Sequence, residues 1–591
     1  MKKYFAMKYI SKIIWGSFTL LLFISLGCKK VLEEKNKSNI TPAIFSTPLG
    51  LQAGLGAAYS NLRFLYGQEA HLYNTEAGVD EIQRGDGAST QMFFYNIQTT
   101  EGNTQALWDQ SYVSINTLNG VIELAPTADL ADDIRDRLIG EAKFLRAWYY
   151  FLLVQTFGDV SLNLDFNTSP SVAASRQPIS EVYAAIIKDL NEAAAALPDF
   201  PPQSNGHASK PAALMLLAKA YLTRGWSDAG ESGDFQMAYA TATDVINNKG
   251  VYQLDLWQNY GDIHKEGNEY GKEVIWVVDR NTDPKAAETN YTGGGGGSPN
   301  GGNKENRSNF YHRPNYPGVQ LDVNAGIPGA PEAKFNVMDR DIKNGRPWLR
   351  VRPSDYALNV AFADRVNDSR YNNTFQTTWI FNRTSDVTTS RGTLIKDVDT
   401  AIWMPGREVT VAERQAFKGV ILAPSQYTGT IYPSMKKYDD QTRLVVNDPS
   451  DRPFIMFKFS ELYLIAAEAA LKGGATLADA ADMLNVLRQR AAYRPTNSDV
   501  ENAAAVVAQT ITPADVTIDF IVDEYARELY GEWRRWYDLK RTQTLAERIA
   551  KYNADAATGF ESPKHLLRPI PQSSQIDLVT EGPPYPQNPG Y

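Results

Sequence analysis

Two stretches of the chain alternate small and large apolar residues at helical spacing, and this pattern constrains the fold more than any other feature of the sequence. Residues 212–248 contain LLAKAYLTRG followed by DFQMAYATATDVI, and residues 461–491 contain ELYLIAAEAALKG followed by ADAADMLNVLRQRA. Apolar residues that recur every three to four positions form one face of a helix, and small residues on that face let a second helix approach closely. Each stretch is therefore predicted to be a pair of closely packed helices.

The segment 140–197 is predicted to supply another helix pair. Leu138, Ala142 and Leu145 lie on one helical face, and Pro178 and Pro198 bound the helix that follows. These pairs resemble tetratricopeptide repeats. Because the copies are not contiguous, they do not form a plain solenoid. We expect a mainly α protein built on a scaffold of tetratricopeptide-like helix pairs.

The middle of the chain, about 255–455, is rich in Gly, Asn, Pro and Thr and has a different character. Residues 291–309 form a low-complexity, glycine-rich loop, whereas EVIWVV at 273–278 is typical of a strand. We interpret this zone as a large irregular insertion of loops and small sheets, and loops on rigid scaffolds commonly carry function. It would divide a helical scaffold at 43–254 from a C-terminal helical part at 456–591 that completes it.

The first residues of the chain indicate where the protein is sent. Residues 1–12 contain four lysines, residues 13–27 are mostly apolar, and the only cysteine of the chain, Cys28, follows directly. A charged region before an apolar run is typical of a signal peptide, and the run of ~15 residues is short against the ~20 that a membrane-spanning helix needs. Ser25–Cys28 resembles a bacterial lipobox. We expect a signal peptide at 1–27 and a lipidated tether at 28–42.

Composition and motifs exclude several other classes of function. The net charge of −9 argues against duplex nucleic acid as a partner, because nucleic-acid binding requires a basic surface. One cysteine permits no disulfide within the chain and no zinc–thiolate cluster, and the five histidines are scattered. The sequence contains no HExxH, GxSxG or phosphate-loop motif. We therefore expect no enzyme activity, no metal and no cofactor.

A series of short motifs follows the chain in a fixed order. They are Asn119 with Gly140–Ala147, Tyr150–Phe151 and Phe157–Val160; Asn367–Tyr371; Ala466–Ala469 with Leu484–Arg488; Glu524–Leu529 with Trp533–Arg541; and Arg568–Pro571 with Gln587–Tyr591. Together with the lipobox-like start, they resemble the SusD/RagB family of Bacteroidota outer-membrane lipoproteins. The resemblance runs from about residue 28 to residue 591.

The resemblance implies a mainly helical cell-surface lipoprotein, anchored in the outer membrane, that serves as a lid on a SusC-like TonB-dependent transporter. Such proteins capture a nutrient, usually an oligosaccharide or polysaccharide, and deliver it for import. The same lid that takes peptides or another nutrient is an alternative, and so is an assembly factor that binds only proteins through its repeats. An exposed aromatic platform would favour a sugar ligand.

The resemblance also places a ligand site in an early loop and in the insertion. Sugars present flat C–H faces and many hydroxyls, so aromatic rings and Asn or Arg side chains suit them. In the early loop, which begins at Asp80, we expect hydroxyl donation by Arg84 and stacking by Phe94 or Tyr95. The expected polar partner is Asn96 or Asn103.

In the insertion, the candidate stacking residues are Tyr311, Tyr316 and Trp348. The alternative for each aromatic candidate, in the loop and in the insertion, is that the ring packs in the interior. The aromatic and basic residues of Trp533–Trp536 could stack on nucleic-acid bases. The apolar helical neighbours of this segment favour packing in the core with cation–π contacts instead.

Overall fold

A computed structural model describes residues 42–169, 171–200, 206–280 and 305–591. Residues 45–591 form one compact unit, and residues 1–44, which include Cys28, group separately. The predicted signal peptide, the lipidation site and nearly all of the predicted tether lie outside the described residues. Within the described residues, no helix has the length and apolar character needed to cross a membrane.

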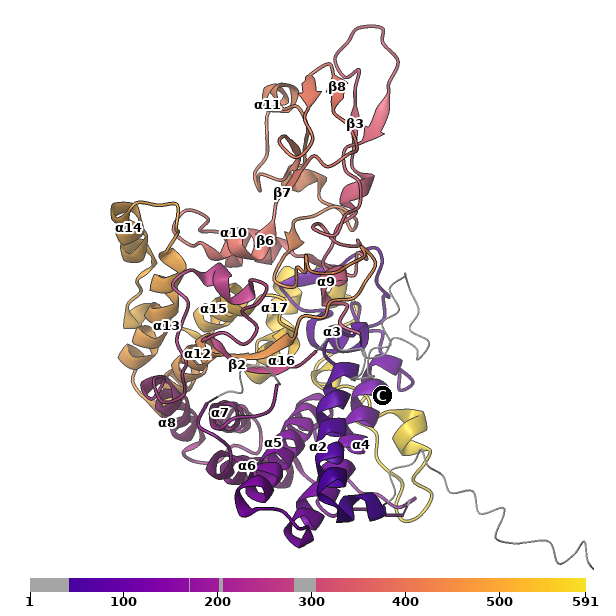
Figure 1. Ribbon diagram of the computed structural model, residues 1–591, viewed down its shortest axis with the longest axis vertical. Coiled ribbons are helices and arrows are strands. Elements are labelled where there is room, and N and C mark those ends of the chain that lie inside the picture. The colour runs from indigo at the N-terminus through magenta and orange to yellow at the C-terminus, as the bar shows by residue number, and fades with distance from the viewer. Residues whose placement is uncertain (1–41, 170, 201–205, 281–304) are drawn as a thin grey trace, which may run out of the picture. The chain divides into compact units, whose positions relative to one another are not determined.

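The N-terminal part of this unit is a succession of helices. They are α2 (Pro48–Asn61), α3 (Glu69–Glu76), α4 (Gly102–Leu124), α5 (Asp132–Phe157), α6 (Ile179–Ala196), α7 (Lys210–Trp226) and α8 (Asp234–Asn247). Helices α2 and α3 both pack on α4, and from α4 to α8 each helix packs on the next (Figure 1). The C-terminal helices are α12 (Phe459–Ala469), α13 (Leu477–Ala492), α14 (Asp499–Gln509), α15 (Ile518–Leu529), α16 (Arg535–Arg541), α17 (Leu545–Tyr552) and α18 (Ala554–Ala557). The mainly α scaffold of helix pairs is confirmed.

The three predicted helix pairs form at the expected places because local sequence starts and stops them. Pro211 lies in the first turn of α7, where a missing backbone N–H costs nothing. The hydroxyl of Thr476 accepts a hydrogen bond from the Asp479 N–H (3.1 Å) and begins α13, and Gly473 ends the preceding turns with a φ of 92°. Helix α8 packs against α12, so helices on either side of the insertion share one core.

The insertion begins and ends in a single strand pair. Strands β2 (Val274–Val278) and β13 (Phe454–Lys458) pair antiparallel, with Val278 opposite Phe454. The strand predicted at 273–278 is therefore confirmed, and its burial on both faces explains its continuous apolar run. The division of the chain at 254/255 and 455/456 stays a prediction.

Between these two strands the described residues form short strands and short α-helices. They are β3 (Gln320–Asp322), β4 (Lys334–Asn336), β5 (Val351–Pro353), β6 (Phe375–Gln376), β7 (Thr378–Ile380), β8 (Val387–Thr389), β9 (Gly392–Leu394), β10 (Thr400–Trp403), β11 (Val420–Ile421), β12 (Ser434–Met435), α9 (Ser308–Tyr311), α10 (Arg370–Thr374) and α11 (Val411–Ala416). Strands β11, β10 and β7 form a three-stranded sheet. Its apolar side chains, including Trp379 and Ile402, build a second core separate from that of the helices.

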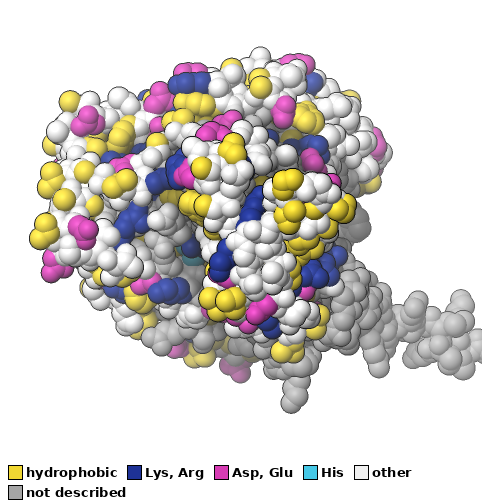
Figure 2. All heavy atoms as spheres, turned by 90° about the horizontal axis from the view of Figure 1, so that it is seen from above, with side chains coloured by type: hydrophobic (Ala, Val, Ile, Leu, Met, Phe, Trp, Pro, Cys, Tyr) yellow, Lys and Arg dark blue, Asp and Glu magenta, His cyan; other side chains and the backbone are white. Residues whose placement is uncertain are grey.

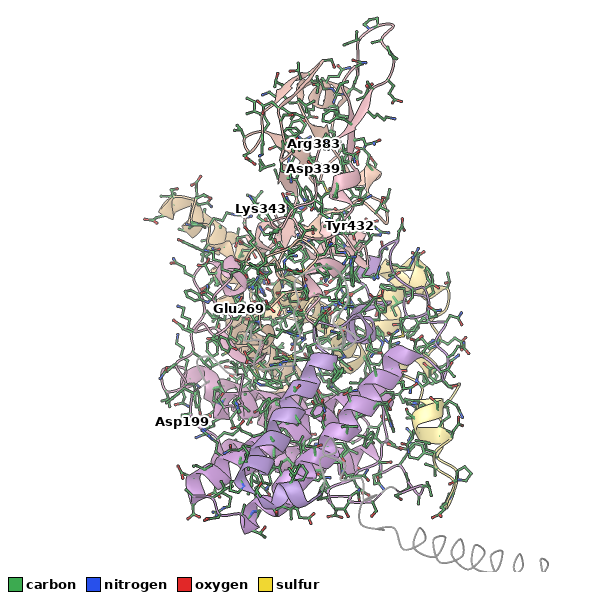
Figure 3. All side chains as sticks on the ribbon, turned by 45° about the vertical axis from the view of Figure 1, so that its right-hand side comes forward. Asp199, Glu269, Asp339, Lys343, Arg383 and Tyr432 are labelled. Carbon is green, nitrogen blue, oxygen red and sulfur yellow. The ribbon has the colours of Figure 1, made fainter. Side chains whose placement is uncertain are left out.

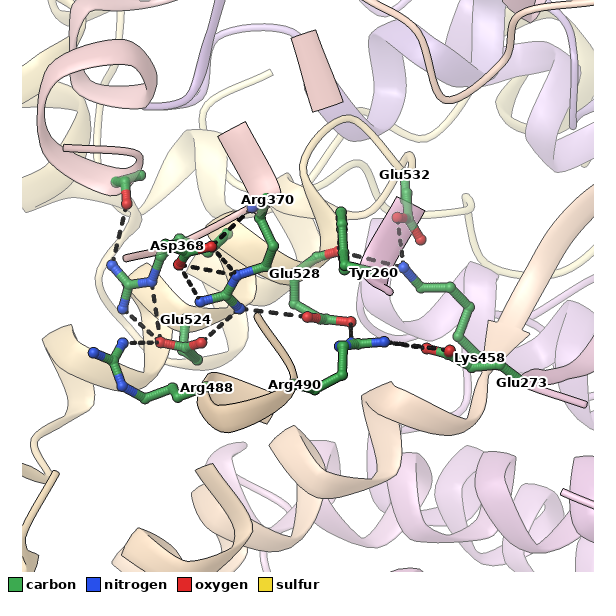
Figure 4. A network of polar contacts seen from close by, with 12 residues as sticks. Tyr260, Glu273, Asp368, Arg370, Lys458, Arg488, Arg490, Glu524, Glu528 and Glu532 are labelled. Atoms are coloured by element: carbon green, nitrogen blue, oxygen red, sulfur yellow. Dashed lines mark hydrogen bonds and ion pairs between the residues drawn. The ribbon is translucent and has the colours of Figure 1, made fainter. Parts of the chain in front are cut away.

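A buried network of ion pairs joins the insertion to the C-terminal helices (Figure 4). Arg370 pairs with Asp368 at 2.7 Å and with Glu524 at 2.6 Å, and Arg490 pairs with Glu273 at 3.0 Å and with Glu528. Burial raises the pKa of Glu524, but the arginines around it outweigh that effect and hold the pKa well below its usual range. Charged residues of two sequence motifs, Asn367–Tyr371 and Glu524–Leu529, are therefore structural.

The Trp533–Trp536 segment is interior, as the core-packing interpretation predicts. Trp536 is fully buried, and the Arg568 guanidinium lies 4.3 Å from the centroid of its ring. Arg535 binds both carboxylate oxygens of buried Asp80 at 2.8 and 2.7 Å. The early loop therefore begins at a carboxylate held by the C-terminal helices.

Candidate ligand-binding site

A short strand pair brings the early loop against the insertion. Strand β1 (Ile82–Arg84) pairs antiparallel with β5, with Arg84 opposite Val351. Past the strand, the Gly85 N–H donates to the Arg350 carbonyl at 3.0 Å and the Gly87 N–H donates to the Leu349 carbonyl at 2.9 Å. A Cβ atom on Gly85 would lie 2.2 Å from the Leu349 carbonyl oxygen, so this close approach requires glycine. The two regions that the family resemblance singled out are thus adjacent.

A polar cavity of about 370 Å³ opens beside this strand pair. Its lining combines groups from β1, β5, the segment before β12 and the C-terminal region: Gln83, Arg352, Asp355, Tyr427, Tyr432 and Asp555. Figure 3 labels Tyr432 of this lining. The same figure labels Asp339 and Arg383, which form a 3.1 Å ion pair elsewhere in the insertion and are not part of the lining. Amide, guanidinium, carboxylate and phenol groups in one hollow supply both donors and acceptors for a hydroxyl-rich ligand.

Trp348 is half-buried and lies just before β5, with arginine side chains around its ring. The guanidinium carbons of Arg350, Arg346 and Arg307 lie 5.1, 5.2 and 5.5 Å from the ring centroid. These distances are within the range of cation–π attraction. Figure 2 shows Lys and Arg side chains around a hollow on the face of the molecule seen from above.

Arg84, Phe94, Asn96 and Asn103, four of the five candidates from the early loop, have surface that solvent reaches. Arg84 turns back on its own loop and donates to the Ala88 carbonyl at 2.9 Å. Phe94 is half-buried and Asn96 is exposed, with its side-chain oxygen accepting a hydrogen bond from Gln98 at 3.2 Å. Asn103 lies in the first turn of α4, where its side chain donates to Glu101 at 2.6 Å. Their roles in ligand binding stay predictions.

Three of the predicted stacking residues require correction. Tyr95, Tyr311 and Tyr316 are at most 2% exposed, and each hydroxyl donates to a backbone carbonyl of the interior. A ring packed on both faces presents no surface to a sugar. These three rings therefore pack in the interior, which was the alternative for each of them. The aromatic candidates with exposed surface are Phe94 and Trp348.

The arginines around Trp348 were missed by sequence reasoning. A signal was present, because RPWLRVR at 346–352 places Arg or Trp at every second position, as in a strand with one polar face. Strand β5 begins only at Val351, because Leu349 has a φ of 57°, which is outside the extended conformation of a strand. Arg307 lies some forty residues earlier, and no local pattern links it to Trp348. Within the described ranges, no group of three or more His, Cys, Asp or Glu side chains is placed to hold a metal ion.

Comparison with known proteins adds relatives of similar length. The chain is 26% identical to SusD-like protein P2 of Formosa agariphila, over 97% of this chain and 99% of that protein. It is 28% identical to a SusD-like protein of Bacteroides ovatus over 45% of this chain and 49% of that protein.

Solved structures have the same fold. A laminarin-binding SusD-like protein superposes with a TM-score of 0.64 at 21% identity, covering 92% of this chain and 100% of that one. Surface glycan-binding protein A from Bacteroides thetaiotaomicron, in complex with laminarihexaose, superposes with a TM-score of 0.61 at 19% identity, covering 92% and 99%.

Two family comparisons match along the chain. Residues 31–222 match a family described as "Starch-binding associating with outer membrane", and residues 272–591 match the SusD family. The second match spans more than half of the chain and includes β2, β13 and every C-terminal helix. The chain therefore belongs to the SusD family.

Proposed function

We propose that this protein captures oligosaccharides or polysaccharides at the cell surface and delivers them to a SusC-like TonB-dependent transporter. The observation that carries the proposal is the meeting of the early loop and the insertion at the β1–β5 pair, beside the polar cavity and Trp348. The similar structures of a laminarin-binding protein and of a complex with laminarihexaose support a glycan as the ligand.

The chemistry of this region suits a glycan. Gln83, Arg352 and Asp355 offer an amide, a guanidinium and a carboxylate within one cavity. The hydroxyls of a sugar act as donors and acceptors, so a mixed lining satisfies more of them than a lining of one charge. Trp348 adds an apolar surface at the rim of the β1–β5 pair, and Arg84 and Phe94 remain the proposed contacts from the early loop.

Capture without catalysis is part of this proposal. Cys28 would carry the lipid that holds the protein in the outer membrane, because several acyl chains on one residue anchor a soluble body firmly. The helical scaffold would face the transporter, and the insertion would face the ligand. No cofactor enters the proposal, since a glycan can be bound by polar side chains and aromatic rings alone.

Affinity electrophoresis tests the proposal directly. The chain without residues 1–28 is run through gels that contain starch, laminarin or another glycan, beside a parallel assay for released sugar. Retardation in at least one gel without release of sugar is the expected result. The absence of retardation in all gels would favour peptide capture or a protein-binding role, and release of sugar would contradict capture without catalysis.

A further inference from the structure

We propose that Trp348 with Arg307, Arg346 and Arg350 forms an anion subsite that takes a carboxylate or sulfate group of an acidic glycan. The inference rests on the proposed function and names the chemical class of its ligand. We call these four residues the Trp348 cluster.

The first argument is the density of positive charge. Three guanidinium carbons lie between 5.1 and 5.5 Å from the centroid of the Trp348 ring. Like charges gathered around one ring repel each other, and the π face of the ring offsets only part of that repulsion. The whole chain is acidic, with a net charge of −9, so this concentration of arginine is local.

The second argument is the missing counter-ion. Arg307 pairs with Glu305 at 2.7 Å, and Arg350 pairs with Glu69 at 2.7 Å. In the described ranges no carboxylate lies within ion-pair distance of Arg346, whose contacts are the rings of Trp348 and Phe310. The cluster therefore holds one more cation than acid.

The environment of Arg346 agrees with this count. Burial, and after it the charges of Arg340, Arg307 and Arg350, lower the pKa of Arg346. Every one of these influences disfavours the cation, and an anion placed beside it would relieve them. A planar carboxylate or a sulfate also matches the paired donors of a guanidinium.

The third argument is that the rest of the cluster is held in place before any ligand arrives. The Arg350 guanidinium donates to the Trp348 carbonyl at 3.0 Å and also contacts the Gly87 carbonyl. The Trp348 ring lies 5.2 Å from Phe310 and 5.8 Å from Tyr311 between centroids. Ordering these groups in advance lowers the entropic cost of binding.

The test compares acidic glycans with neutral partners of the same backbone. The full chain in non-ionic detergent is titrated with dextran sulfate and dextran, and with polygalacturonate and its methyl ester. In at least one of these two pairs, we expect the acidic glycan to bind more tightly than its neutral partner. The dextran pair reports sulfate recognition and the galacturonate pair reports carboxylate recognition.

Substitution then locates the site. We expect Arg346→Gln to weaken binding of the acidic glycan by about ten- to a hundredfold, the usual value of a charge-assisted contact. The matched control is Arg383→Gln, which removes a partly exposed arginine paired with Asp339 elsewhere in the insertion and should leave affinity unchanged. Thermal unfolding of both variants checks that they fold.

The outcomes separate this inference from the proposed function. Neutral glycans bound as well as acidic ones, or acidic binding untouched by Arg346→Gln, would overturn the anion subsite and leave glycan capture standing. If no glycan of either charge binds, here or in the affinity gels, the proposed function fails and the subsite fails with it.

Discussion

The Nη1 atom of Arg370 lies 2.6 Å from the Oε1 atom of Glu524, and both side chains are completely buried. Arg488 and Arg527 contact the other oxygen of the same carboxylate at 3.0 and 2.7 Å. Three cations thus surround one anion in the interior, where removing a single partner leaves charge uncompensated.

Glu524→Gln is expected to destabilise the fold by about 3–5 kcal/mol, because buried Arg370 and partly buried Arg488 and Arg527 lose the carboxylate that they share. Urea unfolding followed by circular dichroism measures the change. Glu332→Gln, which removes the exposed partner of Lys334, is the control and should leave the midpoint where it is. Equal midpoints for the two variants would contradict the structural role of the network.

The pH dependence of stability should contain a contribution from Glu81. Burial raises the pKa of this carboxyl to about 7, although Arg535 acts in the opposite direction. The folded state then binds a proton more tightly than the unfolded state, whose carboxyl titrates near 4.3. This contribution to stability is present at low pH and is lost as the pH rises from about 4.3 through 7.

Glu81→Gln removes that titration. From pH 5 to pH 8 we expect the unfolding midpoint of the wild type to fall relative to the midpoint of the variant, because only the wild type loses the contribution of Glu81. Thermal unfolding at several pH values checks this. A difference that is constant with pH would mean that the Glu81 carboxyl has the same pKa folded and unfolded.

Substitutions of Trp348 and Tyr311 should affect ligand binding and stability differently. Trp348→Ala removes a half-buried ring beside the site, and we expect weaker glycan binding by a folded protein. Tyr311→Phe loses the hydrogen bond to the Gly67 carbonyl (3.1 Å), which costs about 1 kcal/mol of stability, while affinity stays unchanged. Calorimetric titration and thermal unfolding of both variants measure the two effects. If Tyr311→Phe alone lost affinity, the site would have to include that buried hydroxyl.

Gly85→Ala tests the contact between the early loop and the insertion. The added methyl would meet the Leu349 carbonyl oxygen, so we expect a loss of about 1–3 kcal/mol and weaker glycan binding. Gly56→Ala is the matched control: it lies in helix α2 with no atom within 4 Å of the new methyl, and it should gain about 0.5–1 kcal/mol. Retained affinity in Gly85→Ala would separate the site from this strand pair.

Cys28→Ser should release the protein from the outer membrane, because the lipid attachment needs a thiol. Membrane fractionation in cells without the transporter measures this. A variant that still sediments with the outer membrane would contradict the lipobox interpretation.

Sequence periodicity predicted the helix pairs around Leu145, Leu217 and Leu464 because a helix face repeats every three to four residues and needs no distant information. The strand at 273–278 was also evident, since a short apolar run rich in valine marks a buried strand. The orientation of Tyr95, Tyr311 and Tyr316 was not evident, because these residues lie in a turn or in helices of three or four residues, which are too short for a period to separate an inner from an outer face.

Local helical patterns and short motifs were enough to predict the scaffold and the family, and charged members of those motifs, such as Arg370 and Glu524, are buried. The composition of the candidate site depends instead on how the chain packs. Arg307 reaches Trp348 from about forty residues earlier in the chain, and Gly85 meets Leu349 across more than 260 residues. Such contacts depend on the packing of whole elements, which no short stretch of sequence encodes.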